Sequence, residues 1–317
     1  MLTRDDVDAA AKRIAGRVRR TPVLPPDPSE PTGAMTSPIW WKCEWLQHTG
    51  SFKARGAFNR LLAAEEAGEL DRRVGVIAAS GGNAGLAIAY AAAHLGVPAE
   101  IWVPTTAPPV KVARLKSLGA TVVGHGSEYA EAYDGAIERS AATGAVYCHA
   151  YDHVNMAAGA GTIGLELLDQ VPGGFDTVVV AVGGGGLMAG VAAALEPVGV
   201  RVVAAEPTTA ATLRSALAAG GPVDVAVAGV AADSLGARRI GDIAYAVATR
   251  TGVVSALVDD ADIVAARRGL WDSRRIVVEH GAAAAWAALA AGAYVPEPDE
   301  RVVVVLCGAN TNPADLG

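Results

Sequence analysis

A lysine that could do covalent chemistry follows a turn of small residues in the segment Thr49-Gly50-Ser51-Phe52-Lys53. The 26 basic residues include few lysines, and only lysine can form a Schiff base. Small and apolar residues dominate the segment around Lys53, so burial would lower the pKa of its amine and favour the neutral form. Lys53 is therefore a candidate catalytic amine. The alternative is a solvated charge at a helix start.

A second candidate segment, Ser80-Gly81-Gly82-Asn83, stands between a short apolar run and an alanine-rich stretch. Free backbone N–H groups at the start of a helix, together with the Ser80 hydroxyl, could bind a carboxylate. The Asn83 amide could donate to a phenolic oxygen. The spacing does not match the GxGxxG dinucleotide pattern. An ordinary strand-to-helix turn is the alternative interpretation.

The third segment consists of four consecutive glycines, Gly183 to Gly186, followed by Leu187. Each glycine inside a helix costs about 1 kcal/mol relative to alanine, so the run favours a turn. Unhindered N–H groups at a helix N-terminus form a cradle for phosphate. Because no Gly-Lys-Ser/Thr follows, we expect the phosphate to belong to something other than a nucleoside triphosphate.

The fourth segment is the apolar run 302–306, which ends in Cys307-Gly308-Ala309-Asn310. A buried cysteine is most often a small hydrophobic residue. Cys307 is of interest because it lies at the carboxyl end of a predicted strand, as Ser80 and Gly183 do.

The elements that must position these segments alternate between short β-branched runs and helical stretches, a pattern typical of parallel sheets covered by helices. We expect an α/β fold of two domains, each with an open, parallel-rich sheet flanked by helices. The predicted domains are a large one, 1–46 with 149–317, and a small one, 47–148. Ligands of such sheets bind at the carboxyl ends of strands. Strands are predicted at 74–80, 100–104, 120–126, 146–150, 176–182, 200–206, 253–258 and 301–307. Helices are predicted after Thr3 and at 84–96, 108–119, 128–142, 157–170, 187–195 and 209–219.

Composition excludes several classes of function. The net charge of -7 comes with no basic stripe, so nucleic acid is not an expected partner. The three cysteines form no CxxC pair, which favours a reducing cytoplasm, and charges throughout the first twenty residues argue against a secretory signal. The apolar run 177–195 is broken by its glycines, so we interpret it as strand, loop and helix rather than a membrane span. Cys148, His149 and His153 lack a fourth zinc ligand.

Five motifs in order, TGSFKARGA, SGGNAGLAIAYAA, AGAGTIGLE, GGGGL and LCGAN, resemble those of the serine/threonine dehydratases. These are pyridoxal 5'-phosphate (PLP) enzymes of fold type II, with a tryptophan synthase β-like fold, and the resemblance spans nearly the whole chain. It implies PLP as the cofactor, with Lys53 as its Schiff base lysine. The implied cofactor contacts are Phe52 beside the ring, Asn83 at the ring hydroxyl, Gly183, Gly184, Gly185, Gly186 and Leu187 at the phosphate, and Cys307 at the ring nitrogen.

The resemblance also implies a reaction. Ser80, Gly81, Gly82 and Asn83 would bind the substrate, and Lys53 and Ser80 would be the catalytic residues. The implied activity is that of an ammonia-lyase that converts L-threonine or L-serine into a 2-oxo acid and ammonia, in a cytoplasmic homodimer. The alternatives are a threonine synthase, a cysteine-synthase-like β-replacement enzyme, and a non-catalytic phosphometabolite-binding protein.

Departures from the family pattern narrow these expectations. Gly81 stands where racemases of the family usually have a second serine, so racemisation is not expected as the main activity. Thr212 stands where metal-binding members have an aspartate six residues after Glu206. We therefore expect no divalent metal, while a monovalent ion held by carbonyls stays open. Because the chain ends shortly after Asn310, we expect no regulatory domain and no feedback control by isoleucine.

Three further residues have two interpretations each. Glu279 is either a residue near the cofactor or a partner of a helix dipole. Asp233 and Ser234 either line the opening to the substrate or belong to a solvated loop.

Overall fold

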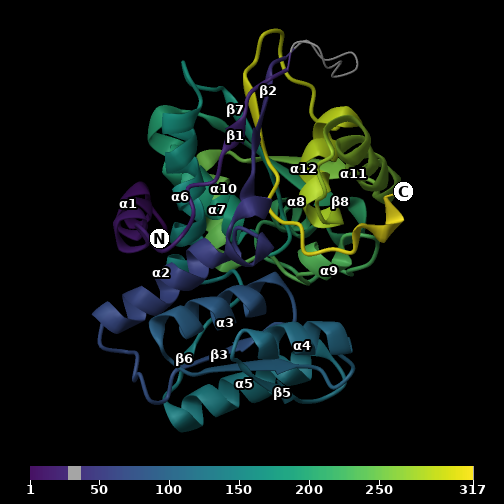
Figure 1. The fold of residues 1–317 in the computed structure, drawn as a ribbon. Helices are drawn as coiled ribbons and strands as arrows, with labels where there is room; N and C mark the ends of the chain where they lie inside the picture. Colours follow the sequence, from purple (N-terminus) through teal and green to yellow (C-terminus); the bar gives the residue numbers. More distant parts are fainter. Residues whose placement is uncertain (28–36, 317) are drawn as a thin grey trace.

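The computed structural model describes residues 1–27 and 37–316, and in this part of the chain two separate sheets form (Figure 1). The larger sheet has the strand order β1-β2-β10-β7-β8-β9, and only β1 runs antiparallel to its neighbour. Its strands are β1 (Val23–Leu24), β2 (Ile39–Lys42), β7 (Thr177–Ala181), β8 (Arg201–Pro207), β9 (Val254–Val258) and β10 (Val302–Val305).

The smaller sheet is entirely parallel and has the order β5-β4-β3-β6. Parallel neighbours need crossover connections, and helices between the strands supply them. The strands are β3 (Val76–Ala79), β4 (Ala99–Val103), β5 (Thr121–Gly124) and β6 (Val146–Tyr147), and the helices are α3 (Asn83–Leu95), α4 (Pro109–Ser117) and α5 (Tyr129–Thr143).

Helices cover the larger sheet and bury its central strands completely. Every residue of β7, β10 and α7 is buried, as expected for strands covered on both faces. In the part of the chain that the structure describes, no helix has the length and apolarity needed to cross a membrane. The helices of this unit are α1 (Arg4–Arg13), α6 (Val154–Gln170), α7 (Gly186–Leu195), α8 (Thr212–Ala219), α9 (Ala232–Leu235), α10 (Asp242–Thr251), α11 (Asp260–Arg274) and α12 (His280–Ala290).

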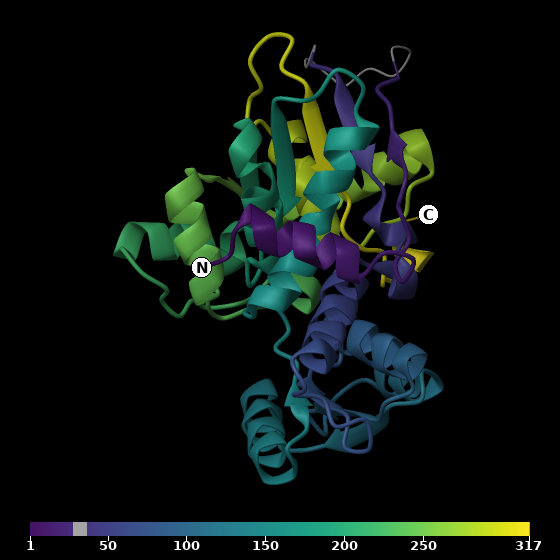
Figure 2. The same ribbon diagram turned by 90° about the vertical axis from the view of Figure 1, so that its left-hand side faces the viewer.

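Helix α2 (Lys53–Glu66) lies between the two sheets and contacts both units, as both views show (Figures 1 and 2). Its backbone packs directly on α6 through glycines. A Cβ atom at Gly56 would lie 2.6 Å from the Met156 carbonyl oxygen, and one at Gly159 would lie 2.5 Å from the Arg55 carbonyl oxygen. No larger residue fits at either position without moving a backbone. The start of α2, where Lys53 stands, is thereby fixed to the larger unit.

The predicted α/β fold with two parallel-rich sheets is confirmed. Every predicted strand forms, although β6 ends at Tyr147 rather than at 150, and the helix predicted at 209–219 begins at Thr212. A helix directly after Glu279 is also predicted and forms as α12, whereas β2 and helices α10 and α11 are not predicted. The domain boundaries near residues 47 and 148 stay a prediction.

Candidate active site

The turn before Lys53 is joined to the chain segment that follows β10. The Phe52 amide donates to the Cys307 carbonyl oxygen at 3.0 Å, and the Ala309 amide donates to the Gly50 carbonyl oxygen at 2.9 Å. Gly50 has a φ of 76°, which favours glycine, and a Cβ atom there would lie 2.9 Å from the Asn310 side-chain oxygen. These contacts place the first residue of α2 beside Cys307.

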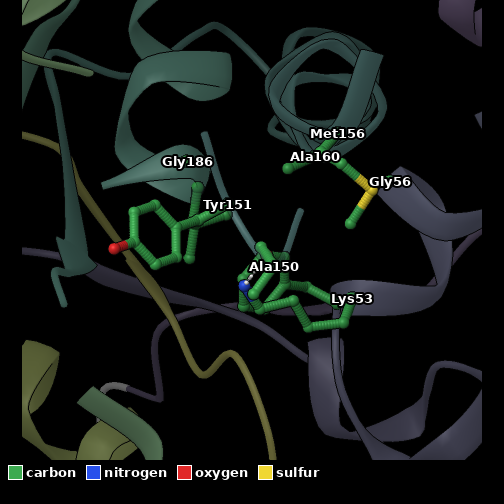
Figure 3. Close-up of a pocket in the computed structure, with 9 residues that line it drawn as sticks. Lys53, Gly56, Ala150, Tyr151, Met156, Ala160 and Gly186 are labelled. Atoms are coloured by element: carbon green, nitrogen blue, oxygen red, sulfur yellow. Dashed lines mark hydrogen bonds between the residues drawn. The ribbon is translucent and has the colours of Figure 1, made fainter. Parts of the chain in front are cut away.

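The Lys53 amine is held inside the protein by a single carbonyl group. Its nitrogen donates to the Ala150 carbonyl oxygen at 2.8 Å (Figure 3) and lies 5.0 Å from the centre of the Phe52 ring. Burial lowers the pKa of Lys53 to about 8, while Cys307 and the Glu279 carboxylate partly oppose this shift. At pH 7 about a tenth of the amine is therefore neutral and nucleophilic, far more than for a lysine with an ordinary pKa.

Lys53 and the glycine turn line the same pocket, so one small molecule can contact both. All the residues predicted as cofactor contacts take part in this lining, from Phe52 to Cys307. The turn Ser80–Gly82 does not line the pocket but directly precedes Asn83, which does. The assigned roles of these residues stay predictions. The full lining consists of Phe52, Lys53, Asn83, Tyr151, Ala181, Gly183, Gly184, Gly185, Gly186, Leu187, Ser234, Leu235, Glu279 and Cys307.

The glycine turn has the shape of an anion cradle. A Cβ atom at Gly183 would lie 2.8 Å from Leu235, one at Gly184 would lie 2.3 Å from the Tyr151 ring, and Gly185 has a φ of 85°. Only glycine fits these positions. Helix α7 begins at the fourth glycine, so its unpaired N–H groups and its dipole face the turn. The turn fits a phosphate group.

Asn83 belongs to a chain of side-chain hydrogen bonds at the pocket wall. Its amide nitrogen donates to Glu279 at 2.8 Å, and its oxygen accepts from the Asn310 amide at 2.6 Å. The same Asn310 nitrogen donates to the Thr49 carbonyl oxygen at 2.8 Å. Burial raises the pKa of Glu279 to about 7, and the bond from Asn83 only partly opposes it. Glu279 lines the pocket and orients Asn83, and it also directly precedes α12, so both of its interpretations stay predictions.

Cys307 presents a neutral thiol to the pocket. Burial, and then the negative charge of Glu279, raise the pKa of this thiol far above its ordinary value. The thiol is therefore protonated at neutral pH and contributes no charge to a ligand.

His149, His153 and Glu206 accept hydrogen bonds from nearby backbone amides. His149 accepts from the Asp152 amide at 2.8 Å, and His153 accepts from the Asn155 amide at 3.1 Å. The Glu206 carboxylate is buried and accepts backbone N–H groups at the start of α8. Among the described residues, no group of three or more histidine, cysteine or acidic side chains is placed to hold a metal.

Residues 233 and 234 differ in their surroundings. Asp233 is exposed and forms an ion pair with Lys111 of α4. Ser234 lines the pocket.

Sequence reasoning missed Tyr151. This residue lines the pocket, where Figure 3 shows it beside Gly186, and a Cβ atom at Gly184 would lie 2.3 Å from its ring. It lies in the loop after β6, which crosses from one unit to the other. No local pattern in the sequence indicates that this loop meets the glycine turn.

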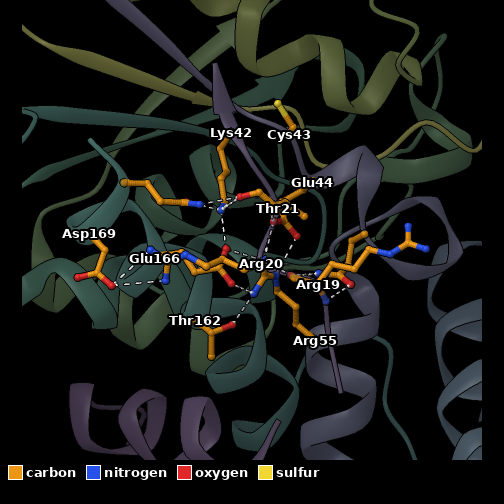
Figure 4. A network of polar contacts seen from close by, with 12 residues as sticks. Arg19, Arg20, Thr21, Lys42, Cys43, Glu44, Arg55, Thr162, Glu166 and Asp169 are labelled. Atoms are coloured by element: carbon orange, nitrogen blue, oxygen red, sulfur yellow. Dashed lines mark hydrogen bonds and ion pairs between the residues drawn. The ribbon is translucent and has the colours of Figure 1, made fainter. Parts of the chain in front are cut away.

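A buried network of charges holds the first turns of α2 (Figure 4). The Arg55 guanidinium bonds both oxygens of Glu44, at 2.8 and 2.9 Å, and both oxygens of Glu166, at 2.6 and 2.9 Å. Lys42 is also buried and donates to Glu166 at 2.5 Å. Two cations face two carboxylates, so the network carries no net charge. It ties α2 to β2 and α6, two residues beyond Lys53.

Comparison with known proteins agrees with this geometry. Residues 14–308 match a family model described as pyridoxal-phosphate dependent enzyme. The chain is 36% identical over 304 residues to a phenylserine dehydratase of Ralstonia pickettii, covering 95% of this chain and 91% of the relative. It is 33% identical over 313 residues to an L-threonine ammonia-lyase of Thermotoga maritima, covering 98% and 76%.

A similar solved structure is that of maize serine racemase. It has a TM-score of 0.90 and 30% sequence identity, and the match covers 99% of this chain and 95% of the racemase.

The charge network generates a stability prediction. Glu44→Gln removes one carboxylate and leaves part of the buried Arg55 charge uncompensated. We expect the free energy of unfolding, measured by urea titration, to fall by about 3–5 kcal/mol. As a control, Asp169→Asn breaks the exposed pair with Arg20 and should change it by about 0.5 kcal/mol or less. Equal effects of the two substitutions would contradict a dominant role for the buried network.

Glu279 generates a pH prediction. Its pKa rises from 4.5 to about 7 on folding. Ionisation of Glu279 therefore does not reduce the free energy of unfolding well below pH 4.5, and the reduction is complete above pH 7. The wild type should therefore lose stability relative to Glu279→Gln as the pH rises. We expect a relative change of about 2 kcal/mol between pH 5 and pH 8, in urea unfolding of the cofactor-free protein. A constant difference between the two proteins over this range would refute the raised pKa.

Proposed function

The chain belongs to the pyridoxal-phosphate dependent enzymes, and on this premise we propose that it is an ammonia-lyase acting on a small hydroxy-amino acid. L-Threonine and L-serine are the proposed substrates, and a 2-oxo acid and ammonia the products. The observation that carries the proposal is the shared pocket of Lys53 and the glycine turn. The named relatives, a dehydratase and an ammonia-lyase, support the same class of reaction.

Different residues of the pocket would bind different parts of the cofactor. Lys53 would bond covalently to the aldehyde carbon, and the amides of Gly183–Gly186 and Leu187 would bind the phosphate. Bound pyridoxal phosphate supplies an electron sink that makes the α-proton of an amino acid acidic. Asn83, oriented by Glu279 and Asn310, can donate a hydrogen bond to a ring hydroxyl.

Lys53 is the proposed base for the α-proton of the substrate. An amine with a pKa of about 8 can give up a proton and take one back near neutral pH, as a general base must. Lys53 would remove the α-proton of the bound substrate. The β-hydroxyl would leave as water with a proton supplied near the phosphate, and one water would then convert the resulting imino acid into the 2-oxo acid and ammonia.

The substrate carboxylate is assigned to the turn that ends β3. Ser80, Gly81 and Gly82 precede Asn83, the first residue of α3, so their amides lie at a helix N-terminus. The Gly82 amide donates to the Ser80 hydroxyl oxygen at 3.3 Å, which leaves the hydroxyl proton available for a carboxylate. We assign Ser80 to substrate binding and catalysis on this basis.

Cys307 favours elimination over reactions that need a strongly electron-withdrawing ring. Its neutral thiol cannot hold a proton on the ring nitrogen as a carboxylate would. Racemisation is a second candidate because the maize racemase is structurally similar. It requires a second proton donor on the opposite face of the substrate, and Gly81 offers no side chain there. A cytoplasmic location and a homodimer complete the proposal.

The central test is the removal of the lysine. Lys53→Ala should abolish 2-oxo acid release because no amine remains to hold the cofactor or take the α-proton. Lys116→Ala, which changes an exposed lysine of α4, is the matched control and should keep full activity. The assay measures 2-oxo acid release from L-serine, D-serine, L-threonine, L-allo-threonine and hydroxyaspartate.

The same panel separates the alternatives. Turnover retained in Lys53→Ala defeats the mechanism. Interconversion of L- and D-serine without 2-oxo acid assigns the protein to the racemases. A colourless protein that cannot be reconstituted with PLP favours a non-catalytic binding protein.

The pKa of Lys53 predicts the pH dependence of cofactor capture. The neutral fraction of an amine with a pKa of about 8 rises about fivefold from pH 7 to pH 8, and less than about twofold from pH 8 to pH 10. The rate at which cofactor-free protein binds PLP covalently, followed by absorbance after rapid mixing, should level off in the same way. A rate that keeps climbing about tenfold per pH unit up to pH 10 would indicate an ordinary, solvated lysine.

A further inference from the structure

The first peptide of the glycine turn is held by a threonine that lies outside the pocket lining. The Thr212 hydroxyl donates to the Gly183 carbonyl oxygen at 2.6 Å, and both residues are buried. The same hydroxyl lies 3.4 Å from Glu206, so the shorter contact to Gly183 takes its single proton. Glu206 is satisfied by other donors, the amides of Leu213 and Arg214 and the hydroxyl of Ser255.

The second peptide of the turn is held from another side. The Gly184 carbonyl oxygen accepts from the Gly241 amide at 3.1 Å. Gly241 precedes helix α10, whose first amides, those of Asp242 and Ile243, both donate to the Asp152 carboxylate at 3.1 Å. Two independent groups thus hold two successive carbonyl oxygens.

Fixing these two carbonyl groups also fixes the direction of the Gly184 and Gly185 N–H groups. In a planar trans peptide the C=O and N–H bonds point in opposite directions. Because the Gly183 carbonyl points towards Thr212, the N–H of Gly184 in the same peptide must point away from Thr212. The Gly184 carbonyl points towards the Gly241 amide, so the N–H of Gly185 must likewise point away from Gly241. Within residues 1–27 and 37–316, neither N–H donates a hydrogen bond to another protein group. Both belong to the residues that line the pocket with Lys53.

We propose that Thr212 is a positioning residue for phosphate binding: its hydroxyl fixes the Gly183–Gly184 peptide so that the Gly184 amide is aimed at the phosphate of the cofactor. The proposal rests on the proposed function for the identity of the ligand. Valine at this position would fill the same volume but leave the buried Gly183 carbonyl without a donor, and that peptide could rotate. Serine would keep the donor.

The test compares cofactors with and without a phosphate. In Thr212→Val, the dissociation constant of PLP from the cofactor-free protein should rise about tenfold, the effect of losing one buried hydrogen bond. The dissociation constant of pyridoxal, which has no phosphate, should change less than about twofold. Thr212→Ser should bind PLP within about twofold of the wild type. Tryptophan fluorescence titration measures all three.

A matched control separates positioning from general structure. Ser255→Ala removes a hydrogen bond to Glu206 without touching Gly183, so it should leave PLP affinity unchanged. Thermal unfolding of each cofactor-free variant checks folding, and Thr212→Ala replaces the valine variant if that one does not fold. The proposal is overturned if the affinities for PLP and for pyridoxal fall equally. It is also overturned if a folded variant without the hydroxyl binds PLP with unchanged affinity.

The outcomes distinguish this proposal from the proposed function. If the wild type binds PLP but releases no 2-oxo acid, the proposed function fails, while the effect of Thr212 on phosphate affinity can still be measured. If the wild type turns over substrate and Thr212→Val binds PLP normally, only the role of Thr212 fails.

Discussion

The burial of the Lys53 amine, with the Ala150 carbonyl as its hydrogen-bond partner, is the constraint on which the rest of the site depends. A charged amine is costly in such a place, so the protein interior favours the neutral form. This benefit persists only while the start of α2 stays in position. The bonds from Phe52 to Cys307 and from Ala309 to Gly50 hold the turn before the lysine. The glycine contacts between α2 and α6 hold the helix after it.

The charges around α2 are distributed so that the paired charges lie outside the pocket, while the pKa values of the groups inside it are shifted towards neutrality. Two residues beyond Lys53, Arg55 is fully paired within a neutral network. In the pocket, the groups that could be charged are pushed towards their neutral forms: the pKa of Lys53 is lowered, and those of Glu279 and Cys307 are raised. In such a pocket, peptide dipoles can hold a bound phosphate. The glycine turn and the start of α7 offer such dipoles.

Much of the fold could be predicted from the sequence because its signals are local. Gly96, for example, ends α3 in the left-handed conformation that glycine favours. That Asn83, the glycine turn and Cys307 share a pocket could be anticipated because carboxyl ends of parallel strands meet, while the place of Lys53 beside them was implied by the family resemblance.

Other contacts could not be predicted from the sequence, because they depend on how distant segments pack. Tyr151 reaches the pocket only because the loop before α6 crosses the glycine turn. Thr212 contacts Gly183 across 29 residues of sequence. Asn310 was visible in a motif, but its bond to Asn83 required the two units to be placed against each other.

Lys42, the buried last residue of β2, and Lys53, the half-buried first residue of α2, also differ in how they could react with an aldehyde. The Lys42 ammonium gives all three of its protons to acceptors, namely Glu166, Gln170 and the Thr21 carbonyl oxygen. An ammonium solvated so completely by protein groups has no lone pair to offer, and its surroundings leave no room for a second reactant. Lys53 has one acceptor and an open cavity beside it. The fold therefore discriminates between two chemically identical side chains, and a reactive carbonyl compound is directed to one of them.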